Sequence, residues 1–162
     1  MAGSAHTKGK GGAPQRRVIA ENRKARHEYE ILDRVEAGLV LTGSETKSLR
    51  AGKGNIAEAY VRFEGGEAFL VDAHIPPYAQ AGPYHNHEPR RPRKLLLSRG
   101  QLERWSRKVQ EKGLTAVPLV LYFRGPWVKL EIGLARGRKL HDKRQAIKER
   151  DTRREVQRAL RR

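Results

Sequence analysis

The side chains best suited to chemistry gather in a proline-rich stretch, residues 75–94. His85 and His87 have the spacing that places two imidazoles on one side of an extended chain, and Glu88 follows them, as in some metal sites. Arginines crowd the same stretch, and their positive charge opposes a bound cation. The stretch is therefore better explained as a loop whose polar side chains bond to backbone or RNA than as a metal centre.

RNA binding requires cations for the phosphates and flat side chains on which unstacked bases can stack. The same loop offers both, and its five prolines exclude a long regular element. Loops of this length inside a compact domain are usually functional. For Tyr78 and Tyr84 the alternative is packing into the core, and the sequence leaves that choice open. The candidate RNA-binding residues of this loop are Tyr84, His87, Arg91, Arg93 and Lys94.

Catalytic motifs are not recognisable in this sequence. Residues 52–54, Gly-Lys-Gly, lack the Ser or Thr that follows the lysine of a phosphate-binding loop. The serines and histidines do not stand in a nucleophile elbow. Glu28 and Glu30 fall on the face of a strand expected to meet solvent. We therefore expect a protein that is not an enzyme and that needs no metal or other cofactor.

Charge is concentrated at the two ends of the chain. The 162 residues carry a formal net charge of +17, and residues 28–135 hold only three of those charges. This distribution predicts one domain with two basic arms, whose phosphate contacts would release counterions from a nucleic acid. Cysteine is absent and no apolar run is long enough to span a bilayer, so we expect a cytoplasmic monomer that does not bind membranes.

Alternating apolar residues predict a long first strand over residues 28–42. Gly38 lies within it and suggests a bulge or bend, as a small barrel needs to turn a corner. Glu36 falls on the face expected to meet solvent. The buried face would carry Tyr29, Ile31, Val35, Ala37, Leu39 and Leu41, with Asp33 as the exception.

Two helices and two hairpins follow this strand. Thr42 with Glu45, and Ser98 with Gln101, have the spacing of capping boxes and predict helices that end near Gly52 and Gly113. Glycine-containing turns at residues 65–66 and 125–126 predict the hairpins, and Pro118 suggests an edge position for the second. The order of elements favours a mainly β fold with helices, an OB-type Greek-key barrel. The apolar residues expected to alternate in the second hairpin are Val117, Leu119, Leu121 and Phe123, then Val128, Leu130, Ile132 and Leu134.

The last 27 residues, 136–162, hold twelve basic and four acidic side chains and only a thin apolar stripe. Leu140 and Ile147 lie on one helical face, as do Val156 and Leu160. A lone basic helix has an unfavourable nucleus, so we expect coil in water and a helix where phosphates neutralise the charge. The alternative is a solvated basic tail without a specific role.

Four separated segments resemble, in order and spacing, the SmpB family, the SsrA-binding proteins that bind transfer-messenger RNA. They are NRKARHEYEI at residues 22–31, GSETKSLRAGKGNI at 43–56, NHEPRRPRKLLL at 86–97 and GRKLHDKR at 137–144. The resemblance covers residues 18–162 and implies an OB-type barrel with packed helices. It divides the chain into a disordered basic arm (1–17), an RNA-binding barrel (18–135) and a basic tail (136–162) that is helical when bound in the ribosome.

The resemblance also implies a function and a set of partners. Proteins of this family bind the tRNA-like domain of transfer-messenger RNA and bring it, with elongation factor Tu, to stalled ribosomes. There they begin trans-translation, which tags the stalled peptide for proteolysis, and their tail occupies the empty mRNA channel at the decoding centre of the small subunit. The alternatives are a general single-strand RNA-binding module and an RNA enzyme built on an OB fold.

Particular residues follow from the matching motifs. The family's RNA-binding face maps onto Asn22, Glu36, Leu96 and Lys129, and without the resemblance Glu36 would be a plain strand residue and Leu96 a core residue. The basic residues Arg23, Lys24, Lys47 and Arg50 stand in the same motifs and are further RNA-binding candidates. The expected decoding-centre residues of the tail are Lys139, His141, Asp142, Lys143, Arg144 and Ile147.

Overall fold

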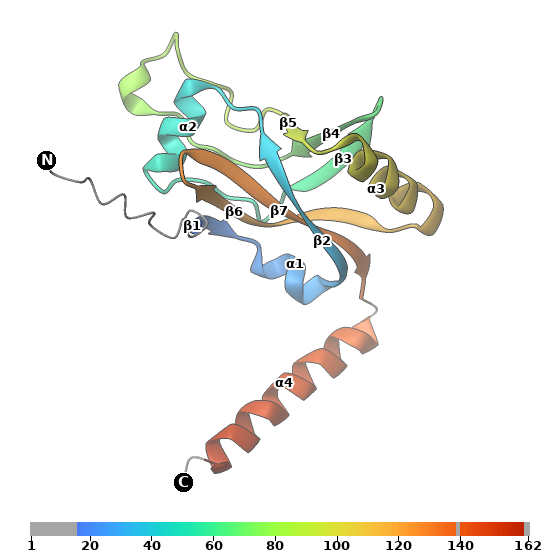
Figure 1. The fold of residues 1–162 in the computed structure, drawn as a ribbon. Coiled ribbons are helices and arrows are strands. Elements are labelled where there is room, and N and C mark those ends of the chain that lie inside the picture. The colour runs from blue at the N-terminus through green and yellow to red at the C-terminus, as the bar shows by residue number, and fades with distance from the viewer. Residues whose placement is uncertain (1–15, 139, 161–162) are drawn as a thin grey trace, which may run out of the picture.

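The computed structural model describes residues 16–138 and 140–160, which form a mainly β fold with packed helices (Figure 1). The mainly β class with helices predicted from the sequence is confirmed. Residues 1–15 of the predicted arm and Lys139 lie outside the described residues, whereas Arg16 and Arg17, which the prediction also placed in the disordered arm, begin β1. The strands are β1 (Arg16–Glu21), β2 (Tyr29–Leu39), β3 (Tyr60–Glu64), β4 (Glu67–Val71), β5 (Arg93–Leu96), β6 (Thr115–Arg124) and β7 (Trp127–Gly137). The helices are α1 (Arg23–Glu28), α2 (Gly43–Arg50), α3 (Arg99–Lys112) and α4 (Leu140–Leu160), with a 3-10 turn, η1, at Ala79–Ala81.

The antiparallel strand pairings close into a circuit. β6 pairs with β3, β3 with β4, β4 with β5, β5 with β2, β2 with β7, and β7 pairs back with β6. β1 pairs with β6 and lies outside this circuit. Closure of this kind removes exposed sheet edges, as expected for a small barrel. Both predicted hairpins are present, as β3–β4 and β6–β7.

Two register shifts redirect side chains that a simple alternation places on one face. In β6 the shift lies between Pro118 and Val120, and in β2 between Ile31 and Asp33. An extra residue in one strand moves every later side chain to the opposite face. Val117 and Leu119 therefore lie outside the main core, whereas Leu121 and Phe123 lie in it. Tyr29 and Ile31 likewise leave the core face predicted for them, while Val35 and Leu39 pack against the core.

A second, smaller apolar cluster lies outside the barrel, between β6 and α1. It contains Ala25, Val117, Leu119, Val120, Tyr122 and Ala135. Asn22 holds α1 there, because its Oδ1 accepts from Ala25 N (3.1 Å) and its Nδ2 donates to the carbonyl of Pro118 (2.9 Å). β6 is thus central, with β1, β3 and β7 as partners, and the edge position expected from Pro118 is wrong. The bulge beside the proline accommodates its missing N–H.

Helices α2 and α3 lie on opposite sides of the barrel in Figure 1 and each adds a buried side chain to the main core. Leu49 of α2 is 0% exposed and Trp105 of α3 is 1% exposed. Both predicted capping boxes are present, at Thr42 and Ser98. The capping residues thus begin each helix where its apolar side faces the barrel.

Several segments differ from the sequence prediction. β1 and α1 were not predicted, and β5 begins at Arg93, inside the stretch expected to lack regular structure. β7 runs to Gly137, and Arg138 N donates to Glu28 O (3.0 Å), so the barrel extends past the expected boundary at residue 136. None of the helices in the described ranges is long and apolar enough to cross a membrane.

Helix α4 extends away from the barrel as a separate element (Figure 1). Its side chains from Arg150 to Leu160 are all exposed. The tail, which the sequence predicts to be coil without RNA, is helical in this structure. The 21 residues of α4 contain no glycine or proline and exceed the roughly 12–15 residues below which isolated helices are marginal.

Candidate nucleic-acid interface

Three of the predicted RNA-binding residues meet on the outer face of the barrel around Gly38. The strand register places Gly38 of β2 opposite Leu96 of β5 on one side and Lys129 of β7 on the other. Glu36 lies two residues earlier in β2, hence on the same face. A Cβ at Gly38 would lie 3.2 Å from Leu96 Cβ, so the glycine permits this close approach rather than forming the bulge expected there. Leu96 is 53% exposed and was correctly kept out of the core.

Glu36 is held by two residues of β6. Its Oε2 accepts a hydrogen bond from the Tyr122 hydroxyl and two from Arg124, Nε at 3.2 Å and Nη2 at 2.7 Å. Partial burial opposes ionisation of the carboxyl, but the bonds from Tyr122 and Arg124 outweigh it and set the pKa of Glu36 below its usual value. Burial, then the neighbouring carboxylate, raises the pKa of Tyr122. Glu36 is thus an ionised acceptor in a predominantly basic surface.

Tyr122, Arg124, Arg16 and Trp127 complete this surface and were missed as site residues. Arg16 of β1 lies over the Tyr122 ring, 4.1 Å from its centroid. Trp127 is 68% exposed at the start of β7, in a position to stack on a base. The register of the β6–β7 hairpin could have identified Tyr122 and Arg124 as site residues, because it pairs Tyr122 with Lys129 and Arg124 with Trp127. We name the set Arg16, Glu36, Leu96, Tyr122, Arg124, Trp127 and Lys129 the barrel face.

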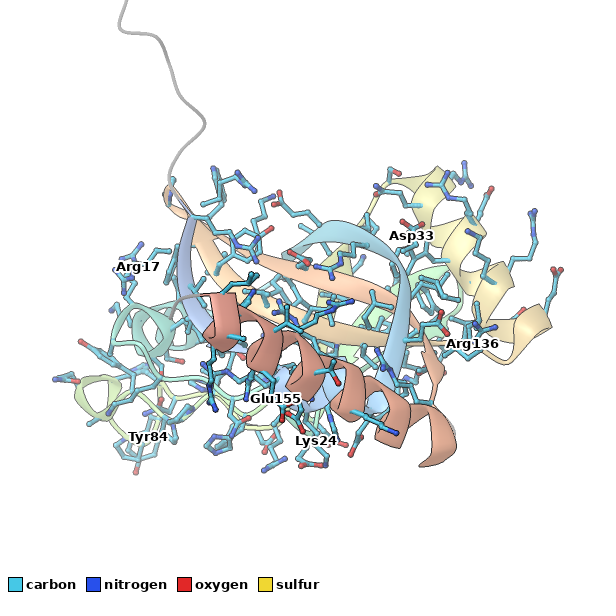
Figure 2. All side chains as sticks on the ribbon, turned by 90° about the horizontal axis from the view of Figure 1, so that it is seen from below. Arg17, Lys24, Asp33, Tyr84, Arg136 and Glu155 are labelled. Atoms are coloured by element: carbon cyan, nitrogen blue, oxygen red, sulfur yellow. The ribbon has the colours of Figure 1, made fainter. Side chains whose placement is uncertain are left out.

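A second candidate surface is the loop between β4 and β5, which displays Tyr84 away from the body of the protein (Figure 2). Tyr84 is 93% exposed, so core packing is excluded for it. The loop is pinned beneath it by Asn86, whose Oδ1 accepts from Tyr78 N (2.9 Å) and whose Nδ2 donates to the carbonyls of Tyr78 and Gly82. Lys47 of α2 lies 5.8 Å from the Tyr78 ring, so the loop and α2 share this side of the barrel.

A buried ion cluster anchors the loop to α2. Glu45 and Arg93 are both 0% exposed, and Arg93 Nε donates to Glu45 Oε2. The other carboxylate oxygen accepts from Arg91 and from Thr42 N (2.9 Å). Arg93 also donates to the carbonyls of Ala73 (2.6 Å) and Pro89 (3.0 Å). Burial opposes the charge of Glu45, but the bonds from Arg91, Thr42 and Arg93 set its pKa below the ordinary value.

Three predicted contact residues are structural instead. Arg93 is fully buried, so it cannot reach RNA without opening the fold. His87 is 9% exposed; its Nε2 donates to Ile75 O (2.8 Å), which leaves Nδ1 to accept from the Ser44 hydroxyl (2.8 Å). Asn22 is 3% exposed and caps α1. We therefore leave these three out of the proposed interface.

The remaining basic candidates lie at the surface on several elements. Lys24 of α1 pairs with Glu58 (3.2 Å) and Lys94 of β5 pairs with Glu67 (2.9 Å). Such exposed pairs are weak and can exchange partners for phosphates. Arg23 lies on α1, and Lys47 and Arg50 lie on α2 beside the pinned loop. The barrel face thus lies on β1, β2, β5, β6 and β7, whereas the remaining basic candidates lie on α1, α2 and β5.

The tail candidates lie in or next to α4. His141, Asp142, Lys143, Arg144 and Ile147 fall in its first half, and the placement of their side chains lies outside the described residues. Lys139 lies outside them altogether. Their predicted role at the decoding centre stays a prediction.

A barrel face with cations, a carboxylate acceptor and an exposed tryptophan, together with a basic helix, defines a nucleic-acid-binding protein. The family model of the SmpB protein matches residues 19–162, and the chain belongs to this family. An SsrA-binding protein of Roseiflexus castenholzii is 58% identical over 144 residues, 89% of this chain and 91% of the relative. One from Microcystis aeruginosa is 51% identical, over 90% and 95% of the two chains. A solved structure described as "tmRNA-SmpB: a journey to the center of the bacterial ribosome" matches with 49% identity and a TM-score of 0.63, covering 79% of this chain and 93% of that one.

Proposed function

We propose that the chain binds the tRNA-like domain of transfer-messenger RNA and brings it to stalled ribosomes, where it acts in trans-translation. The observation that carries this proposal is the family match, which spans both the barrel and the tail. The names of the relatives and of the solved complex support the RNA and ribosome as partners. Elongation factor Tu would join through the bound RNA.

The two parts of the molecule would divide the work. The barrel face supplies recognition, because an ionised carboxylate repels phosphate but accepts hydrogen bonds from exocyclic amines and ribose hydroxyls. The pinned loop and α2 supply Tyr84, Lys47, Arg50 and Arg91 as a second RNA contact. Helix α4 would enter the mRNA channel, with His141 stacked near a ribosomal RNA base. This division places specificity on the barrel and charge at the ends of the chain.

The division predicts how salt affects binding. Fourteen of the seventeen net charges lie outside residues 28–135, so affinity for any RNA should fall steeply as salt rises. The expected slope is roughly 0.7–0.9 log units of the binding constant per log unit of salt for each phosphate neutralised. The preference for the tRNA-like domain over an unrelated RNA of equal length should persist. Filter binding or fluorescence anisotropy at several salt concentrations measures both quantities.

Two results would contradict the proposal. Loss of the preference together with the affinity would show that specificity does not come from the barrel, as in a general single-strand-binding module. Turnover of RNA by the purified protein would indicate an enzyme instead.

A further inference from the structure

We propose that Tyr122 and Arg124 are positioning residues that orient Glu36 so that its Oε1 oxygen accepts a hydrogen bond from RNA. The proposal rests on the proposed function and concerns the same barrel face. The ring of Tyr122 packs in the second apolar cluster, but the fold does not explain why its hydroxyl and Arg124 both donate to Glu36.

The hydrogen bonds to Glu36 are one-sided. The Tyr122 hydroxyl and both nitrogens of Arg124 donate to Oε2. Among the residues that the structure describes, no donor reaches Oε1. The Glu36 side chain is 37% exposed, so a ligand can reach the carboxylate. One oxygen therefore fixes the orientation and the other is presented.

The supporting residues are themselves fixed. Tyr122 is 2% exposed and its ring packs in the second cluster, so the hydroxyl emerges at a defined place. The Arg16 guanidinium covers the ring from β1 and pairs with Glu131 (3.2 Å). Glu131 lies directly opposite Glu36 in the register and carries the same charge. Arg34 of β2 also pairs with Glu131 (3.1 Å) and so compensates that charge. A rigid acceptor loses less conformational freedom when it binds.

The chemistry of the free oxygen identifies the group it would take. An ionised carboxylate accepts hydrogen bonds and cannot donate, so phosphate is excluded and an N–H or O–H donor of the RNA is required. RNA offers exocyclic amines of its bases and ribose 2′-hydroxyls. Lys129 lies on the same face as Glu36 and is placed to contact a phosphate of the same nucleotide.

The test is Tyr122→Phe, which keeps the ring and removes the hydroxyl. Affinity for the tRNA-like domain at neutral pH should fall about 5- to 20-fold. This is part of the effect of one charge-assisted hydrogen bond, because Glu36 stays in place but is oriented less well. The matched control is Tyr60→Phe on β3, an exposed tyrosine outside the barrel face, which should bind like the unaltered protein.

Two further measurements distinguish positioning from a general structural effect. The bonds from Tyr122 and Arg124 favour the ionised form of Glu36. Removing the Tyr122 hydroxyl should therefore raise the pKa of Glu36, so that RNA binding is lost at a higher pH when the solution is acidified. The other groups facing Glu36 are Arg16, Arg34, Lys129 and Glu131, which the variant leaves in place. In a Glu36→Ala background, Tyr122→Phe should have no effect, because coupled residues are not additive.

The outcomes separate this inference from the proposed function. If Glu36→Ala binds the tRNA-like domain normally, the barrel face is not the recognition surface and the proposed division of work fails. If Glu36→Ala binds weakly but Tyr122→Phe keeps both affinity and pH profile, positioning by Tyr122 is overturned. Should Tyr122→Phe melt early, Arg124→Gln replaces it, and an effect that persists in the Glu36→Ala background would show direct contact of Arg124 with RNA. Transcripts with 2′-deoxy or inosine substitutions then distinguish a ribose donor from a guanine amine.

Discussion

Glu45→Gln is expected to lower the free energy of unfolding by about 3–5 kcal/mol, the typical cost of removing one partner from a buried ion pair. The amide keeps the size of the side chain but leaves the Arg93 guanidinium, which is 0% exposed, without its counterion. It also weakens the bond to Thr42 N at the start of α2. Urea unfolding monitored by circular dichroism measures the change.

Two comparisons isolate the buried charge as the cause. Glu64→Gln removes an exposed carboxylate that pairs with Arg62 in β3, and it should change stability by less than about 0.5 kcal/mol. Adding Arg93→Met to Glu45→Gln should restore part of the loss, because the unpaired charge is then gone. A loss below 1 kcal/mol for Glu45→Gln alone would show that the cluster does not hold the loop.

The same cluster gives a pH dependence with a definite sign. The folded-state pKa of Glu45 lies below its unfolded value, about 4.3, so its contribution to stability is complete above that pH. As the pH falls through the lower folded-state value, the carboxylate is protonated and the contribution is lost. The stability difference between the unaltered protein and Glu45→Gln should therefore shrink on acidification below about pH 4. A difference that stays constant down to pH 2 would contradict the assignment.

Local signals explain what the sequence predicted well. The capping boxes at Thr42 and Ser98 and the glycine turns of both hairpins depend on neighbouring residues, and all four are present. Gly43–Arg50 and Arg99–Lys112 begin at the expected caps. Interactions between residues a few positions apart need no knowledge of the rest of the fold.

The failures depend on distant partners. The register shifts in β2 and β6 arise where α1 covers the outside of the sheet, and alternation alone cannot locate an inserted residue. Pro118 is tolerated in a central strand because the register shift beside it accommodates its missing N–H, and Asn22, 96 residues away, satisfies its carbonyl. Arg93 was read as a surface cation because its partner Glu45 lies 48 residues earlier. Each case needed tertiary contacts that the local pattern does not contain.

The candidate site was predicted only in part. Glu36, Leu96 and Lys129 came from the family resemblance, and the register brings them together around Gly38. The resemblance did not include Tyr122 and Arg124, because a residue that positions another is visible only once the hydrogen bonds are known. Their place opposite the strand that carries Lys129 was the available signal.

Ile147→Pro should leave RNA binding intact and severely reduce peptide tagging on stalled ribosomes. Proline in a helix interior costs roughly 3 kcal/mol, and position 147 lies inside Leu140–Leu160. If the tail must be helical in the mRNA channel, that cost lowers its occupancy there about 100-fold. The barrel should melt normally, because the described side chains from Arg150 onward are exposed and add nothing to its core. Far-UV circular dichroism should show the lost helix.

Ile147→Ala is the matched control for this prediction. Alanine favours a helix, keeps every charge and removes only the apolar side chain, so helicity should be retained. Deletion of residues 139–162 is the second comparison; it leaves β7 complete and should abolish tagging while the barrel still binds RNA. Equal loss of tagging in the alanine and proline variants would assign the effect to the isoleucine side chain. Full tagging by Ile147→Pro would show that the tail acts through its charge alone, since the proline variant keeps all the charge and loses only the continuous helix.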